Sequence, residues 1–206
     1  ILSNSKYLIS SHSPDYDLFL NNANNRTSLD NRDAIVFIDQ NFLDDVDILL
    51  LGKKDSKASS NEIRLDFKNK INFFFDSLEK KFSCKVIISA HPKANIKMLS
   101  DCYTGREVIA GDTINLIKDC KFCITHSSTA INFAVLYKKP IMVVQMEILR
   151  SILGDSSYPF ANSFANALNI KPTKIDEGIE EIQFPEVDES AYLNYVKMYI
   201  KEANGE

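Results

Sequence analysis

Short apolar runs separated by polar segments occupy the middle of the chain and predict its strands. They lie at residues 34–38, 86–90 and 107–110, and the stretch 121–145 adds a buried strand, a polar hinge, a buried helix and a second buried strand. A strand without polar interruption is typical of a sheet covered on both faces. Pro92, which cannot donate to a strand ladder, ends the second run.

Between these runs, apolar residues recur at steps of three and four, which predicts helices. The longest follows a solvated loop at residues 51–61, and Ser59 or Ser60 would cap it. Its apolar stripe comprises Ile63, Phe67, Ile71, Phe74, Phe75 and Leu78. We interpret this stripe as core packed on the sheet. Further helices are expected at residues 114–119, 146–153, 160–168 and 189–203, with a loop at 154–159.

Strands that alternate with helices predict an α/β fold, a Rossmann-like parallel sheet with helices on both faces. Residues 34–206 are expected to form this domain. Residues 1–33, rich in Asn, Ser and Asp, are expected to be a leader or the remnant of a preceding domain, with a short strand at 7–10 and an apolar turn at 17–20. Because the chain begins at Ile1 without an initiator methionine, we expect it to be a piece of a longer protein.

Composition narrows the classes of partner. Of the 206 residues, 45% are hydrophobic, and 24 basic against 28 acidic residues give a formal net charge of -4. Such a charge offers no general attraction to nucleic acid or to anionic membranes, so no nucleic-acid partner is expected and any phosphate contact must be local. The sequence shows neither a transmembrane segment nor a signal peptide, which predicts a cytoplasmic protein.

Four cysteines, Cys84, Cys102, Cys120 and Cys123, include one C-x-x-C pair. A second pair is absent from the sequence, and no histidine follows at zinc-finger spacing. We therefore interpret them as structural thiols of a reducing compartment and expect no metal site.

Polar residues stop each predicted strand. In a parallel sheet the carboxyl ends of the strands share one edge, and ligands collect there where the strand order reverses. The stops are Asp39-Gln40, His91-Pro92, Gly111-Asp112-Thr113 and His126-Ser127-Ser128. Together they predict one site at this edge.

The hinge that begins after Thr125 favours a bound anion. Ser127, Ser128 and Thr129 supply hydroxyl donors, and amides without internal partners are expected at the start of the helix that follows. A plain Ser/Thr helix cap is the alternative interpretation. His126 either contributes to the site or orients the hinge.

His91 is the candidate for chemistry, because an imidazole can donate to a phosphate oxygen or act as general acid when a phosphate leaves. The alternative is a purely structural hydrogen bond. Other chemistries are disfavoured, since G-x-S-x-G, G-x-G-x-x-G and G-x-x-x-x-G-K-[ST] patterns are all absent from the sequence.

The order His91-Pro92, Gly111-Asp112-Thr113, then Ser127-Ser128-Thr129 before a helix that ends at Lys139-Pro140 resembles the donor-binding half of GT-B glycosyltransferases of bacterial capsule and surface-polysaccharide assembly. It is most similar to sialic acid and Kdo transferases, which have an HP motif and a later S-S/T motif. The similarity covers roughly residues 34–150.

This resemblance implies a nucleotide-activated sugar, favouring a CMP-sugar, bound without metal or other cofactor. On the same analogy, His91 contacts the nucleotide phosphate and assists departure of CMP, and Ser127 and Ser128 hold that phosphate. Gly111 would let the backbone approach the ligand, while Asp112 or Thr113 lines the cleft. The protein would work in the cytoplasm or peripherally at the inner membrane.

The acceptor side departs from the family pattern. Those transferases keep an acidic general base in their amino-terminal half, and this chain has too little sequence before Ala34 to contain one. The glycan acceptor is therefore expected to bind through a missing domain. Asp39, as a substitute base, and the adjoining Gln40 are further candidates. Two alternatives stay open: an epimerase-like enzyme acting on a UDP-sugar, and a noncatalytic nucleotide-binding or assembly module.

Overall fold

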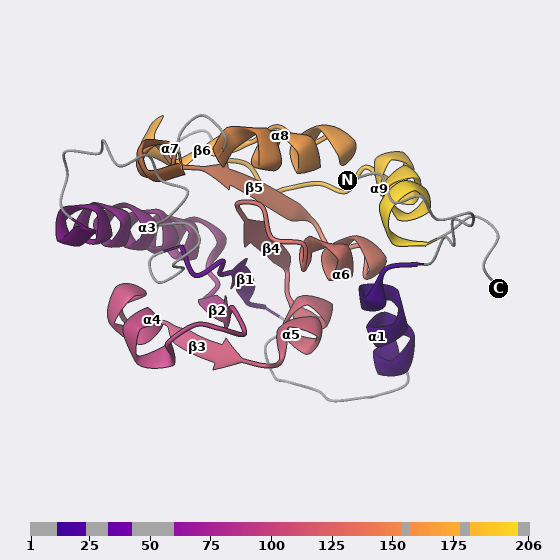
Figure 1. Cartoon of the computed structure of the whole chain (residues 1–206), viewed down its shortest axis with the longest axis horizontal. Helices are drawn as coiled ribbons and strands as arrows, with labels where there is room; N and C mark the ends of the chain where they lie inside the picture. The colour runs from indigo at the N-terminus through magenta and orange to yellow at the C-terminus, as the bar shows by residue number, and fades with distance from the viewer. Residues whose placement is uncertain (1–11, 24–32, 43–59, 154–156, 178–181, 202–206) are drawn as a thin grey trace, which may run out of the picture.

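A central sheet of six parallel strands organises the computed structural model, which describes residues 12–23, 33–42, 60–153, 157–177 and 182–201 (Figure 1). The strands run in the order β3-β2-β1-β4-β5-β6. Their bounds are β1 Ile35–Ile38, β2 Val86–Ala90, β3 Glu107–Ala110, β4 Phe122–Thr125, β5 Ile141–Gln145 and β6 Thr173–Lys174. The predicted α/β, Rossmann-like parallel sheet is confirmed.

The strand order reverses at β1. Ile35 pairs with Val86 of β2 on one side and with Phe122 of β4 on the other. The chain builds outward from β1 to β3, then crosses back and continues from β4 to β6. The carboxyl ends of β1 and β4 thus meet at the switch point, the place at which ligands bind in open α/β sheets.

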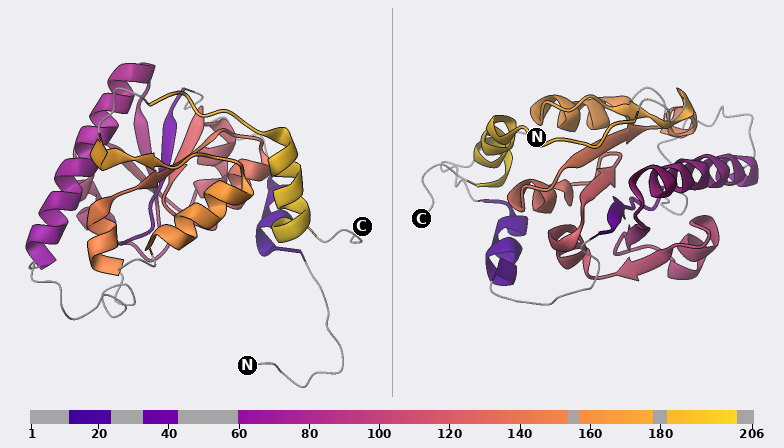
Figure 2. Two further views of the ribbon diagram at one scale, coloured as in Figure 1. Left: turned by 90° about the horizontal axis from the view of Figure 1, so that it is seen from above. Right: turned by 180° about the vertical axis from the view of Figure 1, so that it is seen from behind.

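Helices cover both faces of the sheet, as the uninterrupted apolar strands predicted (Figures 1 and 2). On one face lie α3 Ser60–Phe82, α4 Ile96–Cys102 and α7 Glu147–Leu153. On the other lie α5 Thr113–Asp119, α6 Ile131–Leu136, α8 Ser157–Ala167 and α9 Glu189–Tyr195. Alternate side chains of β1 feed the two cores: Phe37 enters the first, and Val36 enters the second.

The aromatic stripe of α3 is core, as interpreted from its spacing. Phe67, Phe74 and Phe75 are at most 1% exposed. Phe75 meets Phe37 of β1 edge-to-face, with ring centroids 5.1 Å apart. Burial of this stripe against the sheet is what holds so long a helix in place.

Several elements differ from the expected ones. The apolar turn at 17–20 belongs to a helix, α1 Pro14–Ala23, and the helix expected from 160 begins at Ser157. Helix α4 and strand β6 were not predicted. The signal for α4 was Asn95, whose side chain accepts a hydrogen bond from the amide of Met98 at 3.2 Å. The strand expected at residues 7–10 lies outside the described residues.

The two ends of the described chain lie beside each other. The amide of Ser13, just before α1, donates to the carbonyl of Ile200 at 2.8 Å. Ile200 ends a π-helical turn, η3 Val196–Ile200, that continues α9. Helix α1 is also tied to α6, since the amide group of Asn132 donates to Asp15 at 2.8 Å. Among the described residues, no helix combines the length and apolar character that a membrane span requires.

Candidate functional site

The loops that leave β1, β2, β3 and β4 all emerge at the carboxyl edge of the sheet, because the strands are parallel. These loops contain the polar residues singled out from the sequence. Hydrogen bonds connect each of these loops or strand ends to its neighbour: Gln40 bonds Ser127, the Asp39 amide bonds the Ser89 carbonyl, and Ser89 bonds Thr113. We call this series of strand ends and loops the row.

Gln40 and Ser127 join the two sides of the switch point. The Oε1 atom of Gln40 accepts a hydrogen bond from the Ser127 amide at 2.8 Å, and Nε2 of Gln40 donates to the Ser127 hydroxyl at 3.1 Å. Both side chains are partly buried. A single carboxamide therefore occupies the amide and the hydroxyl of Ser127 in this structure.

Asp39, one residue earlier, is a buried carboxylate with only 4% of its surface exposed. Its Oδ1 atom accepts from the Tyr103 hydroxyl at 2.6 Å, and Oδ2 accepts from the Asn41 amide at 2.9 Å. Burial raises the pKa of Asp39, whereas these two hydrogen bonds and the nearby backbone of His91 act to lower it. The carboxylate thus accepts from two donors, the Tyr103 hydroxyl and the Asn41 amide.

His91 follows β2 and is partly exposed. Its Nδ1 atom accepts a hydrogen bond from the Lys93 amide at 3.2 Å, and its carbonyl accepts from the Ala94 amide at 2.9 Å. A ring that accepts at Nδ1 has its hydrogen at Nε2 in the neutral form, so this contact assigns the tautomer. His91 consequently has one N–H donor to offer a ligand, while Pro92 fixes the backbone after it.

His126 has the opposite environment. It is 4% exposed, and Nδ1 lies 2.9 Å from the carbonyl of Val144. The rings of Phe37 and Phe42 contact it edge-on at 6.0 and 5.3 Å. Burial lowers its pKa to about 4, so the ring is neutral near pH 7, and the described residues provide no partner for Nε2. In this structure its contacts orient the hinge.

The donors of the hinge are largely engaged within the chain. The Ser128 amide donates to Oγ1 of Thr125 at 3.1 Å, and the Ala130 amide donates to Oγ of Ser128 at 3.3 Å. Helix α6 begins only at Ile131. We expected the amides at the start of the helix to lack partners. For the amides of Ser128 and Ala130 this expectation was wrong, because side-chain hydroxyls of the hinge accept their hydrogen bonds before the helix begins. Thr129 is exposed.

The loop after β3 completes the row. Gly111 has φ +77, a conformation that favours glycine, and no atom lies within 4 Å of where a Cβ would stand. Asp112 accepts from the side chain of Asn115 at 2.6 Å and makes no cap to α5. The Thr113 hydroxyl lies 2.8 Å from that of Ser89, at the end of β2.

Sequence reasoning missed three members of the row: Tyr103, Asn41 and Ser89. Tyr103 directly follows helix α4, which was itself not predicted. It lies 64 residues after Asp39 in the sequence, too far for a local pattern to connect them. Asn41 has φ 56 and directly follows the candidate pair 39–40. Its position next to a predicted strand end was the sequence signal that could have identified it. Across the described ranges, no three His, Cys, Asp or Glu side chains gather as a metal site would require.

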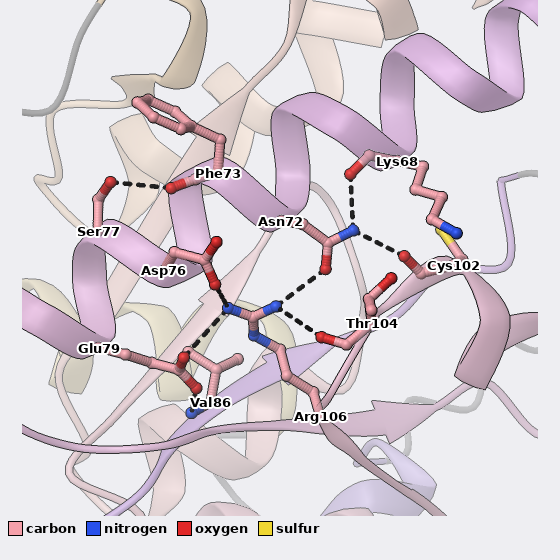
Figure 3. Close-up of polar contacts among 10 residues, drawn as sticks. All are labelled: Lys68, Asn72, Phe73, Asp76, Ser77, Glu79, Val86, Cys102, Thr104 and Arg106. Atoms are coloured by element: carbon pink, nitrogen blue, oxygen red, sulfur yellow. Dashed lines mark hydrogen bonds and ion pairs between the residues drawn. The ribbon is translucent and has the colours of Figure 1, made fainter.

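A second polar cluster surrounds Arg106, just before β3 and therefore at the opposite, amino edge of the sheet (Figure 3). Its guanidinium donates to Asn72, to the carbonyl of Thr104, to Asp76 at 2.6 Å and to Glu79 at 3.1 Å. A hollow of about 540 Å³ lies beside it. None of the residues predicted for the site lines this hollow.

Comparisons with known proteins give a remote structural likeness. No family profile and no curated protein matches the chain. Among solved structures, it is similar to the crystal structure of the glycosyltransferase SnogD from Streptomyces nogalater, at 13% sequence identity and a TM-score of 0.33. The likeness covers 73% of this chain and 43% of that chain, so this chain spans less than half the length of that protein.

Proposed function

We propose that this protein is the donor-binding domain of a metal-independent glycosyltransferase that uses a nucleotide-activated sugar, with a CMP-sugar favoured, in the synthesis of a surface polysaccharide. The observation on which the proposal rests is the row of polar groups at the switch point, centred on His91, Gln40 and Ser127. The order of the short motifs in the sequence supports the same function.

In this proposal the nucleotide phosphate binds against the loops after β2 and β4. Nε2–H of His91 donates to a phosphate oxygen, and the hydroxyls of Ser127, Ser128 and Thr129 supply further donors. Gly111, Asp112 and Thr113 line the nucleotide side, Pro92 holds His91, and His126 supports the hinge. These groups hold an anion mainly with neutral donors, in keeping with the net charge of -4.

Transfer breaks the bond between the anomeric carbon and the phosphate oxygen and forms one to the acceptor hydroxyl. The phosphate takes up the negative charge, which hydrogen bonds from His91 and the hinge stabilise. A base outside this domain takes the acceptor proton. We assign residues 34–206 to the donor domain and residues 1–33 to a leader or a preceding domain, and we place the reaction in the cytoplasm or peripherally at the inner membrane.

Calorimetric titration of the intact protein with CMP, CDP, UDP and ADP tests the proposal. We expect CMP to bind most tightly. His91→Ala should weaken CMP binding about tenfold, because one hydrogen bond to a charged phosphate is worth roughly 1.5 kcal/mol. His12→Ala is the matched control, since His12 lies just before α1 and belongs to none of the four loops.

Each alternative has its own outcome in this titration. Preference for UDP would favour the epimerase-like enzyme. CMP binding without any transfer by the intact protein would favour the noncatalytic module. If none of the four nucleotides binds, the proposal is overturned.

A further inference from the structure

We propose that helix α1 is a brace of the donor site: its two ends hold α5 and α6, and so fix the loop at residues 111–113 relative to the hinge at residues 127–129. Asn22 and Asp15 are the positioning residues of this brace. The inference deepens the proposed function and rests on it. It gives a role in binding to a helix that lies before residue 34, outside all four loops.

Asn22, at the carboxyl end of α1, reaches the loop after β3 through one intermediate side chain. Its Nδ2 atom donates to Oδ1 of Asn115, on α5, at 2.8 Å. Nδ2 of Asn115 donates in turn to Oδ1 of Asp112 at 2.6 Å. A carboxamide that accepts on one side and donates on the other has a defined orientation, so Asn22 fixes the side of Asn115 that meets Asp112.

Asp15, at the other end of α1, holds the helix that follows the hinge. Oδ2 of Asp15 accepts from Nδ2 of Asn132, on α6, at 2.8 Å. Oδ1 of Asn132 accepts from the Tyr195 hydroxyl at 3.1 Å, and the backbone amide of Asn132 donates to the carbonyl of Thr129 at 3.0 Å. Asn132 therefore links α1 directly to the backbone of the hinge.

Between these two ends, α1 packs on Tyr137, which follows α6. The ring of Phe19 meets the Tyr137 ring edge-on, with centroids 4.9 Å apart. The Tyr137 hydroxyl accepts a second hydrogen bond from Nδ2 of Asn22, at 3.3 Å. Asn22 thus contacts α5 and the end of α6 at once, and α1 bridges the two helices (Figure 1).

The face that α1 turns toward the domain is polar at both ends. Leu18 and Leu20 are 54% and 47% exposed, whereas Asn22 is 9% exposed and the contact between Asp15 and Asn132 is partly buried. A helix that is held for stability alone buries its leucines and exposes its Asn and Asp residues. Hydrogen bonds differ from apolar contacts because they fix direction, and a binding site needs its loops held in one arrangement. The polarity of this face therefore supports positioning.

A double-mutant cycle on CMP affinity in the intact protein tests the Asn22 end of the brace. Asn22→Ala leaves the carboxamide of Asn115 without its donor, and we expect CMP to bind about fivefold more weakly. Asp112→Ala removes the group that the brace positions and should weaken binding about tenfold. If Asn22 acts through Asp112, the double variant binds like Asp112→Ala alone. Independent effects would multiply to about fiftyfold and would overturn the inference.

The same helix offers matched controls for both ends. Asn21→Ala changes the same residue type one position earlier, where the side chain is exposed, and should leave CMP affinity unchanged. Asp15→Ala should weaken CMP binding about threefold, whereas Asp17→Ala, whose side chain is 62% exposed, should not. If a control variant loses as much affinity as its partner, the specific contacts of α1 do not matter for binding, and the inference is overturned.

Amide hydrogen exchange gives a readout that needs no ligand. The Leu116 amide donates to the carbonyl of Asp112 at 3.1 Å in the first turn of α5, and the Cys123 amide donates to the carbonyl of Pro140 at 2.9 Å in the sheet. Asn22→Ala should accelerate exchange at Leu116 about tenfold and leave Cys123 unchanged, because the loss is local. Equal acceleration at both amides would indicate a global loss of stability. That result, or no acceleration at Leu116, would overturn the inference.

The exchange measurement separates this inference from the proposed function. If no nucleotide binds but exchange accelerates at Leu116 alone, the proposed function fails and the link between α1 and the loop after β3 is supported. If CMP binds and exchange at Leu116 does not change in Asn22→Ala, the proposed function stands and the brace is overturned.

Discussion

The two edges of the sheet handle polar side chains in different ways. At the amino edge, Arg106 is 4% exposed on its side chain and is bound by two carboxylates, an amide oxygen and a carbonyl. Its guanidinium also lies 5.1 Å from the centre of the Phe75 ring. At the carboxyl edge, the paired side chains of Gln40 and Ser127 are neutral and only partly buried.

The difference indicates that donors held strongly by partners within the protein are poorly placed to bind a ligand. The bonds of Arg106 are charge-assisted, and a ligand would have to compete with two carboxylates for them. A neutral hydrogen bond contributes only about 1 kcal/mol net, so phosphate can replace it. The Arg106 cluster is therefore the structural one, and the neutral Gln40–Ser127 pair marks the better candidate site.

The largest expected effect comes from Arg106→Met, which tests the structural side of the comparison. Removing one partner of a buried ion pair leaves carboxylates without compensation; Glu79 is 22% exposed, whereas Asp76 is 71% exposed. We expect the free energy of unfolding in urea to fall by about 3 kcal/mol, the low end for such pairs. CMP affinity of the folded protein should not change.

Arg64→Met provides the control for this substitution. Arg64 is exposed on α3, the helix that supplies Asp76 and Glu79, and its loss should cost less than about 0.5 kcal/mol. A fall in CMP affinity on loss of Arg106 would show that the amino edge takes part in binding, and the comparison would fail.

The next effect concerns the dependence of stability on pH, through His126. Burial lowers its folded pKa to about 4, below the ordinary 6.5. As pH falls through this window, the unfolded chain takes up a proton that the folded chain does not, so stability is lost. Between pH 7 and 5 the loss should be about 2 kcal/mol. Urea unfolding at both values measures it.

Asp39 contributes with the opposite sign. Its raised pKa means that the folded protein binds a proton before the unfolded chain does, so acidification below the raised pKa favours folding. The difference between the unaltered protein and His126→Gln isolates the histidine. If the free energy of unfolding changes equally with pH in both proteins, the His126 ring is not shielded from solvent. His126 then becomes, like His91, a candidate for contact with the ligand.

Local pattern was enough to predict the sheet and its carboxyl edge. An apolar run such as residues 34–38 can only be covered on both faces, and Pro92 stops a strand wherever the chain folds. Because parallel strands end together, the approximate place of His91 and Ser127 followed without knowledge of the strand order.

The contacts that give each residue its role could not be predicted in this way. Gln40 and Ser127 are separated by 87 residues and Asp39 and Tyr103 by 64, so only the register of β1 between β2 and β4 brings them together. The two histidines show the same limit. Each follows a buried strand, yet His126 is enclosed by two rings and His91 is partly exposed.

The smallest expected effect tests whether a ligand can replace the hydrogen bonds between Gln40 and Ser127. The carboxamide of Gln40 accepts from the Ser127 amide and donates to the Ser127 hydroxyl, and a phosphate would use these same two groups as its donors. Gln40→Ala frees both, so CMP should bind about threefold tighter, a gain of roughly 0.7 kcal/mol. Gln40→Glu places a carboxylate against the same donors and should weaken binding instead, because it repels the phosphate.

Gln183→Ala, at an exposed position, controls for the substitution. Weaker binding by Gln40→Ala would mean that Gln40 contacts the nucleotide directly, and the carboxyl edge would then be a prebuilt site whose bonds are kept and not exchanged.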